Sequence, residues 1–153
     1  LSDVYKRLVF AAVKADGGVV TWGPAGYGGD SSAVAASLSE GVTSVVGNGN
    51  AFAAVKADGG VVTWGPASSG GDSSSVADSL SEGVMSVVAT DCAFAALKAD
   101  GSVVTWGLAD CGGDSSAVAA SLLEGVTSIV ANDAAFAAMK ADFDVVAKRR
   151  RLR

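Results

Sequence analysis

Short apolar runs alternate with turn residues along the chain, and the middle of the sequence shows the pattern most completely. The apolar run Ala51–Val55 precedes Asp58 and Gly59, a pair typical of hairpin turns because glycine accepts a positive φ. The next run, Val61–Trp64, is rich in β-branched and aromatic residues and predicts the second strand of the hairpin. A third strand is predicted over Val84–Val88.

A short helix is expected between the second and third strands. Asp72 is of a type preferred as N-cap, and Gly83 suits a helix C-terminus. Val76 and Leu80 would share one helical face. Because a helix of about two turns is not stable alone, this face must pack against the strands. One unit therefore reads strand, turn, strand, helix, strand.

The whole pattern recurs every 42 residues without insertion or deletion. Units begin near residues 10, 52, 94 and 136, which gives three full units and the start of a fourth. A single unit cannot hide its apolar surface, whereas stacked units can. We therefore predict a mainly β repeat protein with one short helix per unit, as an open arc or partial propeller. The alternative is a closed pseudo-threefold arrangement.

Several apolar positions keep their register in the repeat and are expected to form its core. They are Phe10, Phe52, Phe94, Phe136, Trp22, Trp64, Trp106, Leu38, Leu80 and Leu122. Three aspartates keep their register as well and are expected to cap the helices. They are Asp30, Asp72 and Asp114.

The repeat and the charge pattern divide the chain into three parts. Residues 8–147 form a single repeat domain, residues 1–7 fit nothing downstream and are interpreted as a non-native or disordered leader, and residues 148–153 form a basic tail. The net charge is −5, but residues 1–147 hold 6 basic and 16 acidic residues, a net charge of −10. Because an acidic body repels phosphate, we expect no nucleic-acid binding through it.

Composition also bears on catalysis and on membranes. The chain has no histidine, which excludes imidazole catalysis and every His-ligated metal site. No set of nucleophile, acid and base is visible, so we predict no catalytic, cofactor or metal site and no enzyme activity. No apolar run approaches the roughly 18 residues of a membrane span, so any membrane association would be peripheral.

The stretch Ala54–Gly65 contains Asp-Gly, then Val-Val-Thr-Trp-Gly, and resembles the blade motif of the regulator-of-chromosome-condensation repeat family. That motif reads roughly Ala-Leu-x-x-Asp-Gly-x-Val-x-x-Trp-Gly. The match recurs at Leu97–Gly107 and Ala12–Gly23 and covers most of residues 8–146. The resemblance implies blades of a β-propeller, in a family that serves nucleotide exchange, ubiquitin transfer or scaffolding.

The chain departs from that family in three ways. The usual histidine is absent, the Gly-Gln-Leu-Gly loop is replaced by Gly70–Ser73, and only about half a ring is present. We therefore do not expect the nucleotide-exchange activity of that family in this chain. With its Gly-Gly-Asp-Ser-Ser loop and Ala-x-x-Leu segment, the unit is also similar to tandem repeats of photosynthetic algal protists.

Two of the recurring residue types have a second interpretation. The aspartates could each ligate calcium, but each loop offers one carboxylate where calcium takes six to eight oxygens, so capping is favoured. The tryptophans could stack on sugar rings, since each precedes a loop. A core position is favoured for them because each lies on a strand with two valines.

Cys92 and Cys111 interrupt the repeat, where the preceding unit has Asn50 and Ser69. A hairpin centred on Asp100 would bring residues near 92 and 109 together, so a disulfide is geometrically plausible. Two unrelated or buried thiols are the favoured interpretation.

These patterns favour a non-catalytic structural or interaction protein, an accessory subunit that docks on a larger assembly of proteins. An incomplete array exposes sheet edges that invite partners. The algal resemblance suggests a photosynthetic membrane complex, photosystem and antenna, as host, with the chain peripheral to the thylakoid of a plastid. The alternative is a carbohydrate-binding, lectin-like protein that uses the Trp-bearing loops.

Overall fold

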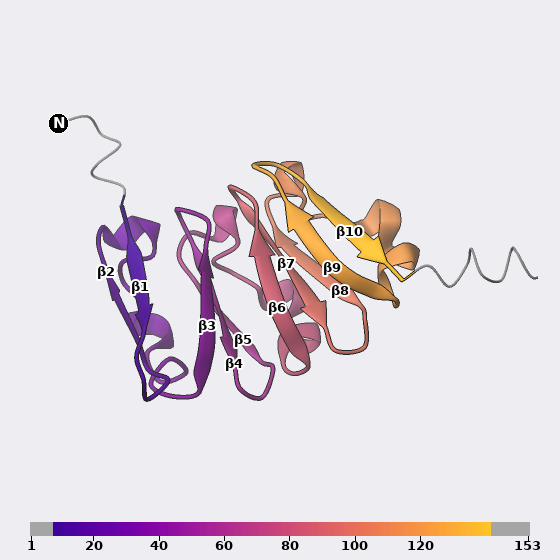
Figure 1. The fold of residues 1–153 in the computed structure, drawn as a ribbon. Helices are drawn as coiled ribbons and strands as arrows, with labels where there is room; N and C mark the ends of the chain where they lie inside the picture. The colour runs from indigo at the N-terminus through magenta and orange to yellow at the C-terminus, as the bar shows by residue number, and fades with distance from the viewer. Residues whose placement is uncertain (1–7, 142–153) are drawn as a thin grey trace, which may run out of the picture.

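The structure is a computed structural model that describes residues 8–141. It is mainly β, with four small antiparallel sheets that stand side by side in chain order (Figure 1). Their strands are β1 (Phe10–Val13) and β2 (Val19–Trp22); β3 (Val42–Gly47), β4 (Phe52–Lys56) and β5 (Val61–Trp64); β6 (Val84–Ala89), β7 (Ala93–Lys98) and β8 (Val103–Gly107); β9 (Val126–Ala131) and β10 (Phe136–Lys140).

The predicted hairpin forms as expected. Strand β4 pairs with β5, and Phe52 lies opposite Trp64. At the turn, Gly59 has φ +80° and donates its N–H to the Lys56 carbonyl at 2.9 Å, while the Asp58 carboxylate accepts from Gly60 N–H. The Asp-Gly pair therefore closes this hairpin through a positive φ and a side-chain hydrogen bond.

Each inner sheet combines strands from two sequence units. The third strand of one unit pairs with the first strand of the next, as β3 does with β4 and β6 with β7. Within residues 8–141 the two sheets at the ends have two strands each, and β1 lacks the neighbour that β4 has in β3. Each inner sheet thus spans the boundary between two sequence units. Its backbone hydrogen bonds hold these two units together.

The predicted two-turn helix is wrong in type. Within the described residues the segment forms short 3₁₀ turns, namely η3 (Ser32–Val34), η5 (Ser74–Val76), η6 (Asp78–Leu80) and η8 (Ser116–Leu122), and η8 is interrupted at Val118 with φ −121°. Serines favour turns over helix interiors, and β-branched valine loses side-chain freedom in a helix. Leu80 nevertheless packs inward as the amphipathic pattern predicted, with 2% of its surface exposed.

Two apolar clusters fill the space between neighbouring sheets. One contains Leu38, Phe52 and Trp64, and the other contains Leu80, Phe94 and Trp106. Strand β4 contributes to both, because alternate side chains point to opposite faces of the sheet.

Each unit has another 3₁₀ turn directly after its second strand. These turns are η2 (Ala25–Tyr27), η4 (Ala67–Ser69) and η7 (Ala109–Cys111).

The expected leader at residues 1–7 and the basic tail at 148–153 lie outside the described residues.

Candidate interaction surface

The phenylalanine and tryptophan of each hairpin form a stacked cross-strand pair. Their ring centroids lie 5.3 Å apart for Phe10 and Trp22, 5.2 Å for the second pair and 5.5 Å for the third, with interplanar angles of 17° to 23°. The register that places these rings opposite each other is set by the hairpin turn. Each unit therefore presents one apolar pair at the same end of its sheet.

A glycine of the preceding unit receives each inner pair. Gly28 ends η2 with φ +92°, and a Cβ at this position would come within 2.9 Å of the Phe52 ring. The Trp64 indole N–H donates to the Gly28 carbonyl at 3.0 Å, so the buried indole is satisfied. Glycine is required here both for the positive φ and for the close approach of the ring.

The next unit makes the same contacts with Gly70. This residue has φ +91°, a Cβ on it would lie 2.6 Å from the Phe94 ring, and its carbonyl accepts from Trp106 Nε1 at 3.0 Å. Thr63 fixes the loop by donating to the Gly71 carbonyl at 3.0 Å and by hydrogen bonding to Ser73. The glycine loop is thus held in place by the strand that precedes it.

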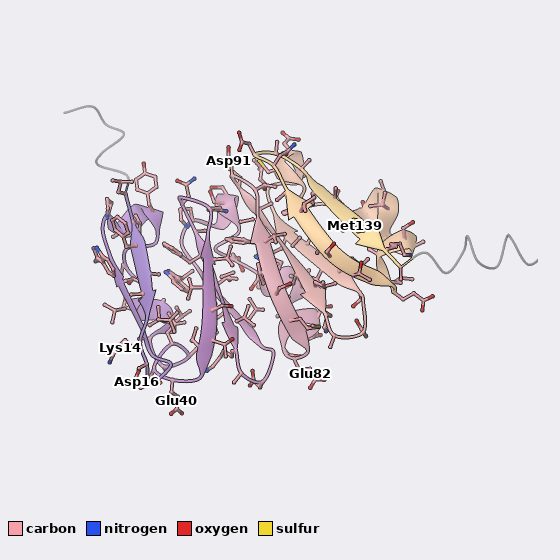
Figure 2. The ribbon with its side chains drawn as sticks, in the orientation of Figure 1. Lys14, Asp16, Glu40, Glu82, Asp91 and Met139 are labelled. Carbon is pink, nitrogen blue, oxygen red and sulfur yellow. The ribbon has the colours of Figure 1, made fainter. Side chains whose placement is uncertain are left out.

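A lysine contact also joins successive units, and no sequence pattern indicated it. Lys56 Nζ donates to the Ser37 carbonyl at 2.8 Å, and Lys98 Nζ donates to the Ser79 carbonyl at 2.7 Å. Lys14 makes an ion pair with Asp16 instead, at 3.3 Å. Figure 2 shows Lys14 and Asp16 together at the turn of the first hairpin.

The first aromatic pair is not in the core, contrary to expectation. Phe10 is 48% exposed and Trp22 is 49% exposed, whereas the same residues of the second and third hairpins are 7% exposed or less. The reason is that no glycine loop of a preceding unit covers them within residues 8–141. Phe136 and Leu122, near the other end, are half-buried, while Leu38 is buried.

The three recurring aspartates are not the N-caps that we predicted. Each lies one residue before the N-cap of its 3₁₀ turn. The N-cap residues of the 3₁₀ turns are Ser31, Ser73 and Ser115, and none of them makes a side-chain capping bond. The carboxylate of Asp72 accepts the N–H of Ser74 at 2.9 Å, and Asp30 and Asp114 make the equivalent contact. The hydroxyl and backbone N–H of Ser74 lower the pKa of Asp72 below its usual value. These aspartates still satisfy the first N–H of the turn, as a short Asx turn rather than as N-caps.

No cluster of three or more potential metal-ligating Cys, Asp or Glu side chains occurs in the described part of the chain.

Cys92 and Cys111 are free thiols, so the disulfide that the sequence allowed is not formed. They lie near each other, because the Leu108 N–H donates to the Cys92 carbonyl at 2.9 Å and the Cys111 N–H donates to the Leu108 carbonyl at 3.0 Å. Partial burial and the neighbouring Cys92 thiol raise the pKa of Cys111. Ionisation of the Cys111 thiol is therefore disfavoured.

Only one of the three tryptophans remains available to stack on a sugar ring. Trp64 and Trp106 are buried and their indole N–H groups are engaged, so neither presents a face to a ligand. Trp22 alone is half-exposed.

No protein-family model matches the chain, and no curated protein is significantly similar to it. Among the described residues, no helix has the length and apolar character needed to cross a bilayer.

Proposed function

We propose that this chain is a non-catalytic structural and interaction protein, an accessory subunit that docks on a larger assembly. The observation that carries the proposal is the exposed pair Phe10 and Trp22, whose counterparts are buried wherever a neighbouring unit covers them. Exposed aromatic residues on an apolar patch are typical of protein contact sites. Leu8 and Val20, also about half exposed, belong to the same end of the molecule.

The partner is a protein rather than a nucleic acid. Residues 1–147 carry a net charge of −10, which repels a phosphate backbone. The similarity of the repeat to those of photosynthetic algal protists supports a photosynthetic membrane complex of the plastid as host. The chain would then lie at the thylakoid surface as a peripheral subunit.

A lectin-like role is the second candidate, and Trp22 is the observation that favours it. One half-exposed indole can stack on one sugar ring, whereas a repeated platform would need Trp64 and Trp106 at the surface. A glycan array tests this candidate directly: binding that is lost in Trp22→Ala would support it, and an array without hits would remove it.

The docking proposal is tested by native isolation. The protein is captured from its source cells with an antibody and separated by native electrophoresis, and co-migrating proteins are identified by mass spectrometry. We expect it in a complex much larger than its own 15.0 kDa, together with other proteins. Migration as a free chain, or as copies of itself alone, would contradict the proposal.

A further inference from the structure

Two cysteines lie at the open end of the third hairpin, the end away from its Asp100 turn. Cys92 lies in the turn between β6 and β7, directly after Asp91, which Figure 2 labels. Cys111 is the last residue of the 3₁₀ turn η7, which follows β8. They are the two cysteines of the chain, and both are partly buried free thiols. The only thiols of the protein are therefore gathered at one place in the fold.

Backbone hydrogen bonds hold the two cysteines on facing segments. The hairpin register pairs Ala93 with Gly107, and one position further out the Leu108 N–H donates to the Cys92 carbonyl at 2.9 Å. The Cys111 N–H donates to the Leu108 carbonyl at 3.0 Å, which closes a four-residue turn. Leu108 is thus bonded to both cysteine backbones, and the turn brings the second cysteine back toward the first.

A side-chain contact holds Cys111 from the other direction. The hydroxyl of Thr90, two residues before Cys92, donates to the Cys111 carbonyl at 2.7 Å. The Cys92 thiol is close enough to contribute to the raised pKa of Cys111, after the larger effect of partial burial. The two thiols are therefore neighbours that the surrounding hydrogen bonds keep together.

The preceding unit has the same arrangement without the thiols. Asn48 donates its side-chain N–H to the Ser69 carbonyl at 2.7 Å, a contact equivalent to that of Thr90. Asn50 and Ser69 stand where the third unit has its cysteines. The loop geometry thus belongs to the repeat. Both substitutions in the third unit are to cysteine, and they fall on two positions that the fold already brings together.

We propose that Cys92 and Cys111 form a modification site that closes to a disulfide by exchange with a small-molecule disulfide of the glutathione class. The inference is independent of the proposed function and gives the chain a second covalent state. Closing the bond requires the two side chains to rotate toward each other, while the pairing of β7 with β8 stays intact.

The exchange takes place in two steps. In the first, the Cys92 thiolate attacks one sulfur of glutathione disulfide, the S–S bond of that molecule breaks, and a glutathione thiolate leaves and takes up a proton. In the second, the Cys111 thiolate attacks the Cys92 sulfur and releases the other glutathione. The protein dithiol loses two electrons and two protons, and one glutathione disulfide is reduced to two glutathione thiols.

The order of the steps follows from the surroundings of Cys111. Its partial burial and the neighbouring Cys92 thiol raise its pKa, so it is disfavoured as the first nucleophile. Once the Cys92 sulfur is bonded to glutathione, that sulfur can no longer carry a charge. Ionisation of Cys111 is then less disfavoured, which allows the second step.

The disulfide clamps a part of the third unit that contacts both of its neighbours. Gly112, directly after the second cysteine, has φ +91° and lies against the Phe136 ring of the next unit. The hairpin between the cysteines carries Phe94, which packs on Gly70 of the preceding unit. A bond that closes the loop over residues 92–111 restricts the unfolded chain. The oxidised form is therefore the more stable one.

The test uses the full chain, reduced and then treated with glutathione disulfide at mildly alkaline pH. Remaining thiols are alkylated, and the protein is digested and analysed by mass spectrometry without reductant. Cys92→Ser and Cys111→Ser each keep one thiol, and the double serine variant keeps none. In that double variant, Asn50→Cys with Ser69→Cys places a matched pair one unit earlier.

We expect the wild-type chain to gain one disulfide between its two cysteines. Cys111→Ser should stop with one glutathione on Cys92, and Cys92→Ser should react more slowly. By circular dichroism, the oxidised wild-type chain should melt about 5–10 °C above the reduced one. The double serine variant should melt at the same temperature in both conditions. The matched pair of Asn50→Cys with Ser69→Cys should also close, because the repeat geometry is the same.

A wild-type chain that ends with glutathione on both cysteines, or with disulfides between chains, would overturn the inference, because the thiols would then not meet. A disulfide that leaves the melting temperature unchanged would contradict the clamp. Equal rates for Cys92→Ser and Cys111→Ser would contradict the order of the two steps. A matched pair that stays open while the wild-type chain closes would show that the repeat geometry is not the cause.

Discussion

Strands β1 and β4 share the sequence Phe-Ala-Ala-Val and the same pairing with the strand that follows, yet their surroundings differ. In β4 these four residues are all buried, whereas in β1 three are exposed and one is half-buried. The aromatic pair stacks at 5.3 Å in the first hairpin and at 5.2 Å in the second. Hairpin register and ring stacking are therefore properties of the unit, while burial is a property of its neighbours.

This difference separates two sources of stability. In a stack of units, stability is approximately the sum of what each unit contributes and what each boundary contributes. A substitution of Phe10 or Trp22, which are about half exposed, changes mainly the first contribution, and the same substitution of a buried counterpart changes both. Pairs of equivalent substitutions can therefore measure the boundary directly.

The largest difference is expected for the phenylalanines. Phe94 is 0% exposed, and Phe94→Ala should lower the free energy of unfolding by about 3–5 kcal/mol, as for other buried aromatic truncations. Phe10→Ala, at a half-exposed ring, should cost about 1 kcal/mol through the lost stacking with Trp22. Urea unfolding followed by circular dichroism measures both. Equal losses would show that the first hairpin is as well covered as the third.

The next largest loss of stability is expected for a substitution in a glycine loop. Gly70→Ala strains a positive φ and also drives a methyl group against the Phe94 ring. Gly49 has the same φ of +91° with nothing within 4 Å of a Cβ, so Gly49→Ala isolates the backbone strain, about 1–2 kcal/mol. Gly70→Ala should cost about 1–3 kcal/mol more, since the buried ring has no space to move into. Equal unfolding free energies for the two variants would contradict a tight contact between ring and loop.

Removal of the tryptophan hydrogen bond should lower the free energy of unfolding by a smaller amount. Trp106→Phe leaves the buried Gly70 carbonyl without its donor, which should cost about 1–3 kcal/mol. Trp22→Phe removes an N–H that has no acceptor within residues 8–141, so its effect on dilute protein should be much smaller. The same urea experiment compares them. A similar loss at both positions would mean that the Trp22 indole N–H also has a partner.

The comparison also shows what the pattern of residues could predict. The Asp-Gly turns and the valine-rich runs determine the hairpins locally, so β4 and β5 were predicted almost to the residue. The recurring Phe and Trp positions identified the core of the inner units, because every copy carries the same signal. Because every copy carries that signal, it could not reveal the exposure of Phe10 and Trp22, which depends on whether a neighbouring unit covers them and not on their own sequence.

Other features escaped prediction for different physical reasons. The Lys56 contact ends on a backbone carbonyl, and carbonyls carry no residue signature. The helix expected after Asp72 became 3₁₀ turns because serine and valine resist an α-helical interior. The pairing of β3 with β4 joins two units, and strand content alone does not determine which strands become neighbours.

The smallest predicted effect concerns Lys14 and Asp16 at the first turn. The Gly18 N–H, and then Lys14 through its hydrogen bond and charge, hold the pKa of Asp16 below its usual value. A carboxyl with a lowered folded pKa contributes stability above its unfolded pKa, near 4, and this contribution is lost as the pH falls through the folded pKa. Lys14→Met should raise the pKa of Asp16 but leave it below the usual value, because the Gly18 N–H remains. An NMR titration of the Asp16 carboxyl carbon measures both midpoints.

The matched variant is Lys56→Met, which removes a lysine from the second turn and should leave the Asp16 midpoint unchanged. The titration also sharpens the contrast between an end and a boundary. Lys14 pairs with Asp16 at the end of the molecule, whereas Lys56 donates to the Ser37 carbonyl across a boundary between units. An Asp16 midpoint that is the same in Lys14→Met as in the wild-type chain would show that Lys14 does not act on this carboxyl.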